Sequence, residues 1–317
     1  MHRVLQINLT CSCKNIVQKY RKGFTIILKT KTLREQFEIF CKTNKPKDMQ
    51  TAVNYFAVFG GLDIKVDTSK PLGTLITRHI LSDYSKLQKS IEELTKNDGI
   101  YHKLLTGIAL GDGRVSTTFK RADLEYDDEY GSLLDLEDLK LIKLQEPVVI
   151  LDEQSNIGNK NNKFIFTTAF LRFWFAFVSP LYKGISKSNF DEFFEKFSNY
   201  QMQFMDLIFE QLCQEYIKDF YKDEIKVIGN FWNESSEEIQ IVAKTKDNRV
   251  IAALCKYNNQ KIKTKQLNSF IDTCKSLNIE PDIVVLFSKN GYSTELKAQK
   301  SEQLKLFTVK SLKALII

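Results

Sequence analysis

The stretch Glu237-Glu238-Ile239-Gln240-Ile241-Val242-Ala243, followed shortly by Ala253-Leu254-Cys255-Lys256-Tyr257, decides the fold of this chain. Both segments combine aliphatic and β-branched residues with single polar residues, a pattern typical of β-strands. A polar turn, Lys246-Asp247-Asn248, lies between them, and a helical segment that carries Glu210 comes before them. We therefore expect two neighbouring strands that follow a helix, as in a layered domain of helices and sheet.

The alternation of side chains along a strand predicts which residues share a face. Glu238 and Gln240 are two residues apart and are expected to point the same way. Ile239 and Ile241 are expected on the opposite side, facing the core. The first strand should thus present one polar and one apolar face.

The polar positions can be compared with what metal-dependent phosphodiester cleavage requires. Carboxylate oxygens must hold a hard divalent cation, and a lysine assists the water or the developing charge. Leu254 and Lys256 share a face, but leucine offers no oxygen ligand, and Gln240 offers a neutral amide. Glu210 and Glu238 are the nearby acids; the competing interpretation is that Glu238 and Lys256 pair or are solvated.

Length and composition set the class of protein. A chain of 317 residues exceeds what one hydrophobic core usually organises, so two or three domains are expected. Hydrophobic residues make up 43% and charged residues 27%, which is ordinary for a globular protein. No apolar run reaches the about 18 residues that span a bilayer, and the N-terminus lacks a signal-peptide core. We therefore expect a cytoplasmic protein that contacts no membrane.

The six cysteines are scattered, and without an export signal they are expected to be reduced thiols. Cys11-x-Cys13 resembles half of a tetrahedral metal site. No second cysteine pair and no His-x-x-x-His motif completes it. The sequence predicts no metal site and no bound cofactor.

The pattern along the chain predicts five parts. Residues 1–32 contain two extended segments, 4–13 and 24–30, in a stretch rich in lysine and arginine. This basic arm is an appended arm, a loosely packed hairpin or an extension beyond the natural start. The others are a helical region (33–98), a winged-helix-like domain (99–168), a helical bridge (169–221) and a nuclease-like α/β domain (222–317), whose first helix covers about 199–221.

The winged-helix prediction rests on the order of elements in residues 99–168. Two short helical patterns, 100–110 and 115–122, flank the turn Gly111-Asp112-Gly113. An acidic stretch with further helical character follows. The remaining segments are strands at 139–144, 147–151 and 164–168, with a polar turn at 155–162 between the last two.

The C-terminal part alternates strands and helices. After a long helix, strands are expected at 225–231, 237–244, 249–257, 282–288 and 304–309, and helices at 263–277 and near 294–300. A helix, three strands, a crossover helix and another strand make an α/β sandwich. The fold class is therefore multidomain α+β, with a helical and winged-helix region followed by this sandwich.

The C-terminal half, from about residue 163, resembles the domain-of-unknown-function 234 family, a branch of the PD-(D/E)XK nuclease-like superfamily. The resemblance is carried by Phe170-Leu171-Arg172-Phe173-Trp174-Phe175, Phe209-Glu210, Ile228-Gly229, Phe231-Trp232, Glu238-Ile239, Ile241-Val242-Ala243 and Cys255-Lys256-Tyr257. It implies a nuclease fold of the restriction-endonuclease type at the end of an AAA-class ATPase. The site it implies comprises Glu210, Glu238, Gln240 and Lys256.

The departures from the family pattern fall at the site. The family's Glu-Ile-Asp is Glu238-Ile239-Gln240 here, and its acidic-x-Lys is Leu254-Cys255-Lys256. Two acidic ligands are therefore missing, which weakens the attraction for Mg²⁺. The chain also lacks Gly-x-x-x-x-Gly-Lys-Ser/Thr, so no nucleotide site is predicted and an ATPase would be a separate partner.

Two basic segments are candidates for contact with nucleic acid, and the net charge of +7 is compatible with such a partner, although it also occurs in proteins that bind none. Cations and hydroxyls bind phosphates and base edges. The candidates are Arg114, Ser116, Thr117, Lys120 and Arg121 in the winged-helix segment, and Lys261, Lys263 and Lys265 after the third strand of the α/β domain. Each group also fits a solvated or structural role, and the acidic stretch 123–138 would repel a DNA backbone on its side.

Three hypotheses follow. The first is a DNA-binding or scaffold protein with a degenerate, inactive nuclease-like domain, that is, a pseudoenzyme. The second is a Mg²⁺-dependent nuclease in which Glu238 or a neighbour replaces the missing acids. The third is a protein-interaction module that works beside a separate ATPase.

Overall fold

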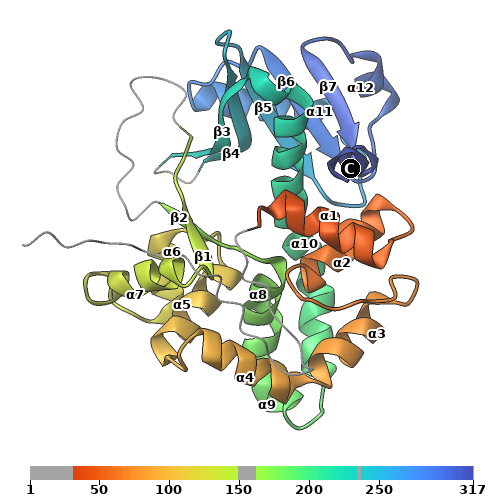
Figure 1. The fold of residues 1–317 in the computed structure, drawn as a ribbon. Coiled ribbons are helices and arrows are strands. Elements are labelled where there is room, and N and C mark those ends of the chain that lie inside the picture. The colour runs from red at the N-terminus through yellow and green to blue at the C-terminus, as the bar shows by residue number, and fades with distance from the viewer. Residues whose placement is uncertain (1–30, 149–161, 234–236, 317) are drawn as a thin grey trace, which may run out of the picture.

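The computed structural model describes residues 31–148, 162–233 and 237–316. Helices dominate its first part, and a mixed β-sheet makes up its last part (Figure 1). The fold class is therefore α+β, as the sequence predicts. The predicted strands at 4–13 and 24–30, the Cys11-x-Cys13 pair and the whole segment 149–161 lie outside the described residues.

The helical part begins at α1 (Leu33–Asn44), where a capping box joins Thr32 and Glu35. In α2 (Met49–Phe59), the Asp48 side chain accepts from the backbone N–H of Thr51. Within the predicted helical region 33–98, the segment from Leu72 onward is not one continuous helix. It consists of α3 (Leu72–Ile76), a π-helical turn (Thr77–Leu81) and α4 (Tyr84–Leu94).

Three helices and a hairpin follow: α5 (Gly99–Leu110), α6 (Val115–Ala122), α7 (Tyr126–Asp138), β1 (Ile142–Gln145) and β2 (Lys163–Phe166). The two strands are antiparallel, with Gln145 opposite Lys163. Gly113 has φ +79°, and its carbonyl accepts from the N–H of Phe164. A side chain at Gly113 would meet the Phe164 carbonyl, so this close approach of the α5–α6 turn to β2 requires glycine.

The next helices are α8 (Ala169–Phe173), a π-helical turn (Trp174–Val178), α9 (Tyr182–Ile185) and α10 (Asp191–Tyr221). The last of these is continuous from Asp191 to Tyr221, and its part from about residue 199 is the predicted first helix of the α/β domain. Asp191 and Glu192 in its first turn interact favourably with the positive end of the helix dipole.

The sheet has the strand order β3-β4-β5-β6-β7. Its strands are β3 (Ile225–Trp232), β4 (Glu238–Thr245), β5 (Val250–Lys256), β6 (Ile283–Ser288) and β7 (Leu304–Thr308). The pairs β3–β4 and β4–β5 are antiparallel, and the pairs β5–β6 and β6–β7 are parallel. Helix α11 (Thr264–Ser276) connects β5 to β6, and α12 (Thr294–Ala298) connects β6 to β7. This is the predicted order of a helix, three strands, a crossover helix and another strand.

One prediction about β4 is wrong: Ile239 and Ile241 do not share a face. Ile239 packs in the cluster beside α11, and Ile241 in the cluster beside α10. The cause is a β-bulge, because Phe231 pairs with Ile239 while Gly229 pairs with Val242. Two steps along β3 thus correspond to three along β4, and the extra residue reverses the alternation next to Gln240.

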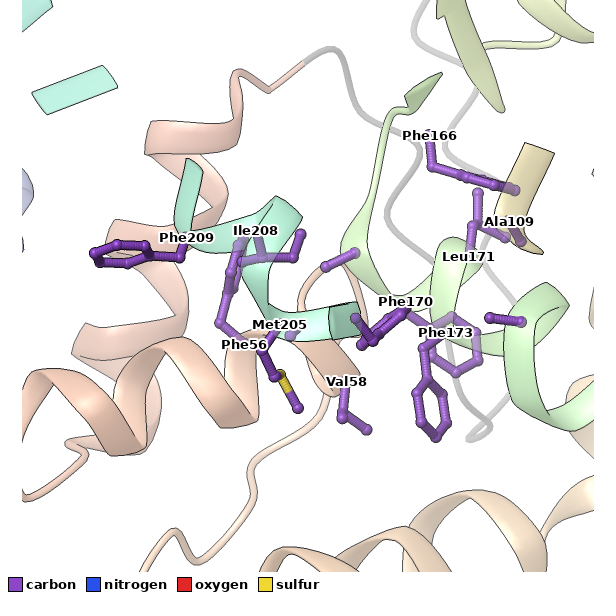
Figure 2. Packing of buried hydrophobic residues seen from close by; sticks show 14 of the residues in the cluster. Phe56, Val58, Ala109, Phe166, Phe170, Leu171, Phe173, Met205, Ile208 and Phe209 are labelled. Carbon is purple, nitrogen blue, oxygen red and sulfur yellow. The ribbon is translucent and has the colours of Figure 1, made fainter. Parts of the chain in front are cut away.

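The larger hydrophobic cluster joins the helices to the α10 face of the sheet. Figure 2 shows Phe56 of α2, Phe170 and Phe173 of α8 and Phe209 of α10 within it. A smaller cluster fills the space between the sheet and α11. No helix in the part of the chain that the structure describes is long and apolar enough to cross a membrane.

Replacement of Phe173 by alanine should destabilise the protein strongly. Its ring is fully buried and lies within 6.1 Å, between centroids, of the rings of Phe177, Phe193, Phe197 and Phe204. The cavity and the lost contacts should lower the free energy of unfolding by about 3–5 kcal/mol, measured by urea denaturation. Tyr200→Ala, at a side chain that is 54% exposed, is the control and should stay within about 0.5 kcal/mol of the unsubstituted protein. Equal losses in the two variants would contradict this account.

Candidate functional site

Glu210 lies at the centre of the candidate site, on the face of α10 that meets β3 and β4. Its side chain is 9% exposed and accepts two hydrogen bonds from amide groups. Asn230 Nδ2 of β3 donates to Oε1 at 2.5 Å, and Gln240 Nε2 of β4 donates to Oε2 at 3.0 Å. Each carboxylate oxygen therefore has a partner within the protein.

Gln240 uses both ends of its side-chain amide. While Nε2 donates to Glu210, Oε1 accepts from the backbone N–H of Cys255 at 2.7 Å. The β4–β5 pairing begins at Ile241 and Ala253, so this side chain continues the contact where the strands no longer pair. Gln240 thus supports the bulged end of β4. Loss of either hydrogen bond would leave a polar group of the site without its partner, which destabilises the fold.

Glu238 is bound by a lysine that the sequence analysis did not single out. Lys163 Nζ, at the start of β2, lies 2.8 Å from both Oε1 and Oε2 of Glu238. Lys163 is 5% exposed, and its ammonium lies 4.5 Å from the centre of the Trp232 ring. The sequence signal available was a lysine directly before the apolar run that begins at Phe164, but nothing nearby identifies Glu238 as its partner.

Lys256 lies at the end of β5, apart from the Glu210–Gln240 contact. Burial raises the pKa of Asp206, and the positive charge of Lys256 offsets part of this rise. The Asp206 carboxylate, one turn before Glu210 on α10, also accepts from the N–H of Tyr257 at 2.9 Å. Leu254 packs beside α11, in the smaller cluster, on the side of the sheet away from Glu210. Asp206 is a further residue that the sequence analysis missed.

The environment of Glu210 favours its protonated form. Burial raises the pKa of this carboxyl to about 7, and the negative charge of Glu238 acts in the same direction. The hydrogen bonds from Asn230 and Gln240 and the charge of Lys163 lower the pKa and offset part of this shift.

These groups line a cavity of about 340 Å³ between α10, the β1–β2 hairpin and the sheet. Mg²⁺ does not fit it, since the oxygens of Glu210 and Glu238 are bound by amide and ammonium groups and Leu254 faces away. Within residues 31–148, 162–233 and 237–316, no group of three or more His, Cys, Asp or Glu side chains is placed to hold a metal ion.

The basic candidates of the α6 segment divide into two kinds. Arg114 is 4% exposed and forms an ion pair with Asp112 at 3.3 Å, so its guanidinium does not lie on the surface. Thr117 Oγ1 also donates to Asp112. The side chains of Ser116, Lys120 and Arg121 are exposed, and Arg121 Nη1 donates to the carbonyl of Leu110 at 2.9 Å.

The second basic group is fully on the surface. Lys261, Lys263 and Lys265 are exposed, in the loop after β5 and at the start of α11. Lys289 lies beside them, because its ammonium donates to Asn259 at 2.9 Å and lies 5.0 Å from the centre of the Tyr257 ring. The structure therefore gathers cations at the ends of β5 and β6, away from the α6 candidates.

A family comparison covers the segment that contains Glu210, Glu238, Gln240 and Lys256. Residues 174–267 match the DUF234 family. The family is described as archaea bacterial proteins of unknown function. The match includes α10, β3, β4 and β5, and it confirms the DUF234 resemblance for this segment. No curated protein matches the chain.

Two solved structures are similar to parts of the chain. One is a chain of an EndoMS–dsDNA2 complex, with 10% sequence identity and a TM-score of 0.20; 30% of this chain and 43% of that one are covered. The other is protein VC1899 from Vibrio cholerae, with 14% identity and a TM-score of 0.27; 72% of this chain and 54% of that one are covered. This chain thus spans about half the length of the solved structures that it matches.

Replacement of Glu210 by glutamine should change the pH dependence of stability. The pKa of Glu210 rises from 4.5 to about 7 on folding, so protonation favours the folded state. This contribution is present at low pH and is lost as the pH rises through 7. The unsubstituted protein should therefore lose about 2 kcal/mol more of its unfolding free energy between pH 5 and pH 8 than Glu210→Gln does. Urea denaturation at both pH values measures the difference, and equal losses in the two proteins would contradict the shifted pKa.

Proposed function

We propose that this protein is a DNA-binding scaffold whose nuclease-like domain carries no metal-dependent chemistry. The observation that supports the proposal is the bonding of the two acids: amides bind Glu210 and the Lys163 ammonium binds Glu238. A divalent ion would have to displace these partners and give up its own water ligands. The proposal therefore includes no metal cofactor; Mg²⁺ belongs to the alternative in which the protein is a nuclease.

The surface that we assign to DNA is the basic group after β5. Lys261, Lys263 and Lys265 are exposed cations, and amide side chains such as Asn258 and Asn259 lie between them and the strand. Such a surface suits the phosphate backbone, which needs positive charge and places few demands on geometry. The α6 segment, as a winged helix, would add Ser116, Lys120 and Arg121, whereas Arg114 and Thr117 would hold its turn.

Binding of duplex DNA should weaken steeply with salt. Each phosphate contact releases counterions, so each contact makes the slope of log K against log salt concentration more negative by about 0.9. The triple variant Lys261→Ala, Lys263→Ala, Lys265→Ala should make this slope less negative by about 2–3, measured by fluorescence anisotropy with a labelled duplex. The matched control replaces Lys86, Lys89 and Lys96, on and after α4, and should leave the slope unchanged.

Two results would contradict the proposal. One is an absence of DNA binding at low salt, which would favour a protein-interaction module beside a separate ATPase. The other is plasmid cleavage in Mg²⁺ or Mn²⁺ that disappears in Glu210→Ala, which would establish the nuclease alternative.

A further inference from the structure

Polar side chains at the end of the β1–β2 hairpin contact the sheet, and Val148, just after β1, packs against the sheet in the smaller hydrophobic cluster. Phe166 of β2 stacks against Phe175 at 6.0 Å between ring centres, on the side of the helices. Gln145 and Lys163, which lie opposite each other at the end of the hairpin, extend to β3 and β4 instead. The hairpin stands between the helices and the sheet (Figure 1), so its end is the place where the two parts meet.

Gln145 connects the hairpin to Glu210 through one intermediate. Its Nε2 donates to Asn230 Oδ1 at 2.6 Å, and Asn230 Nδ2 donates to Glu210. Beyond the strand, the backbone N–H of Val148 donates to the carbonyl of Asn230 at 2.8 Å. Asn230 therefore joins the hairpin to the buried carboxylate by both its side chain and its backbone.

Lys163 enters the same cavity as a cation. Its ammonium lies between the carboxylate of Glu238 and the ring of Trp232, and it also lowers the pKa of Asp112 and of Glu210. A buried ammonium is expensive to desolvate unless anions and hydrogen bonds surround it. The acidic cavity meets this requirement, and two carboxylate oxygens at 2.8 Å contact the ammonium directly.

We propose that the cavity lined by Glu210 and Glu238 is a binding site for this chain's own β1–β2 hairpin, with Lys163 as the bound cation. The contact extends to α6, because Arg114 forms a β-bridge with Lys163 and the N–H of Val115 donates to the carbonyl of Asn162. Occupation of the cavity thus fixes the first turn of α6 relative to the sheet. The inference rests on this geometry and holds whether or not the protein binds DNA.

Apolar side chains at positions 163 and 238 would fill the same space without an ion pair. They therefore test whether the ion pair itself, and not merely the filling of the cavity, holds the hairpin. Replacement of a buried ion pair by hydrophobic residues of similar volume commonly preserves folding, while the directional contact is lost. Lys163→Met with Glu238→Leu is therefore the informative variant, and Lys163→Met alone leaves Glu238 without its partner. Lys143→Met, at an exposed position of β1, is the control on the same hairpin.

Hydrogen exchange followed by mass spectrometry on the full chain tests the proposal. In the double variant, amides of residues 113–118 and 162–166 should exchange at least about tenfold faster, while those of β5 and β6 keep their protection. The control should match the unsubstituted protein in both regions. Unchanged protection of the hairpin and of α6 in the double variant would overturn the proposal. Loss of protection in β5 and β6 as well would also overturn it, since the pair would then support the whole fold and not the docking of the hairpin.

Discussion

A carboxylate that is almost fully removed from water must find hydrogen-bond donors or take up a proton, and Glu210 does both in part. Asn230 and Gln240 donate to it, and its pKa still rises to about 7. Much of the surrounding structure follows from this constraint. The bulge in β4, the two hydrogen bonds of the Gln240 amide and the position of Asn230 on β3 together place donors around one buried acid.

Under the function proposed above, the position of a metal site is kept without its ligands. In a metal-dependent nuclease, carboxylates gather around a divalent ion that neutralises them. Here Gln240 and Leu254 stand where the resemblance implies acidic ligands. Amides donate hydrogen bonds to Glu210, and an ammonium from a different part of the chain neutralises Glu238. The charge of Glu238 is thus balanced by a residue of the protein itself.

The sequence predicts the elements well, because their signals are local. The strand pattern at 237–244 and 249–257 and the crossover helix depend on residues close together in the chain, and the structure contains all of them. The partners of Glu210 and Glu238 depend on distant residues. No local pattern joins Lys163 to Glu238, 75 positions away, and the face of Ile239 depends on a bulge that is set by β3. Burial of Arg114 similarly follows from its bridge with β2 and its pairing with Asp112, whereas the sequence alone marks it as one of several cations.

Helix α10 is 31 residues long and extends for about 46 Å, longer than the diameter of a small domain. Its first turns pack against α8 and the phenylalanine cluster, and its later turns cover the sheet beneath Tyr257 and Phe287. A single rigid rod therefore belongs to both halves, and neither half has a complete apolar interior without it. As a result, heat or denaturant should melt the molecule in one cooperative step, and a protease that cuts within this rod should leave no independently folded fragment.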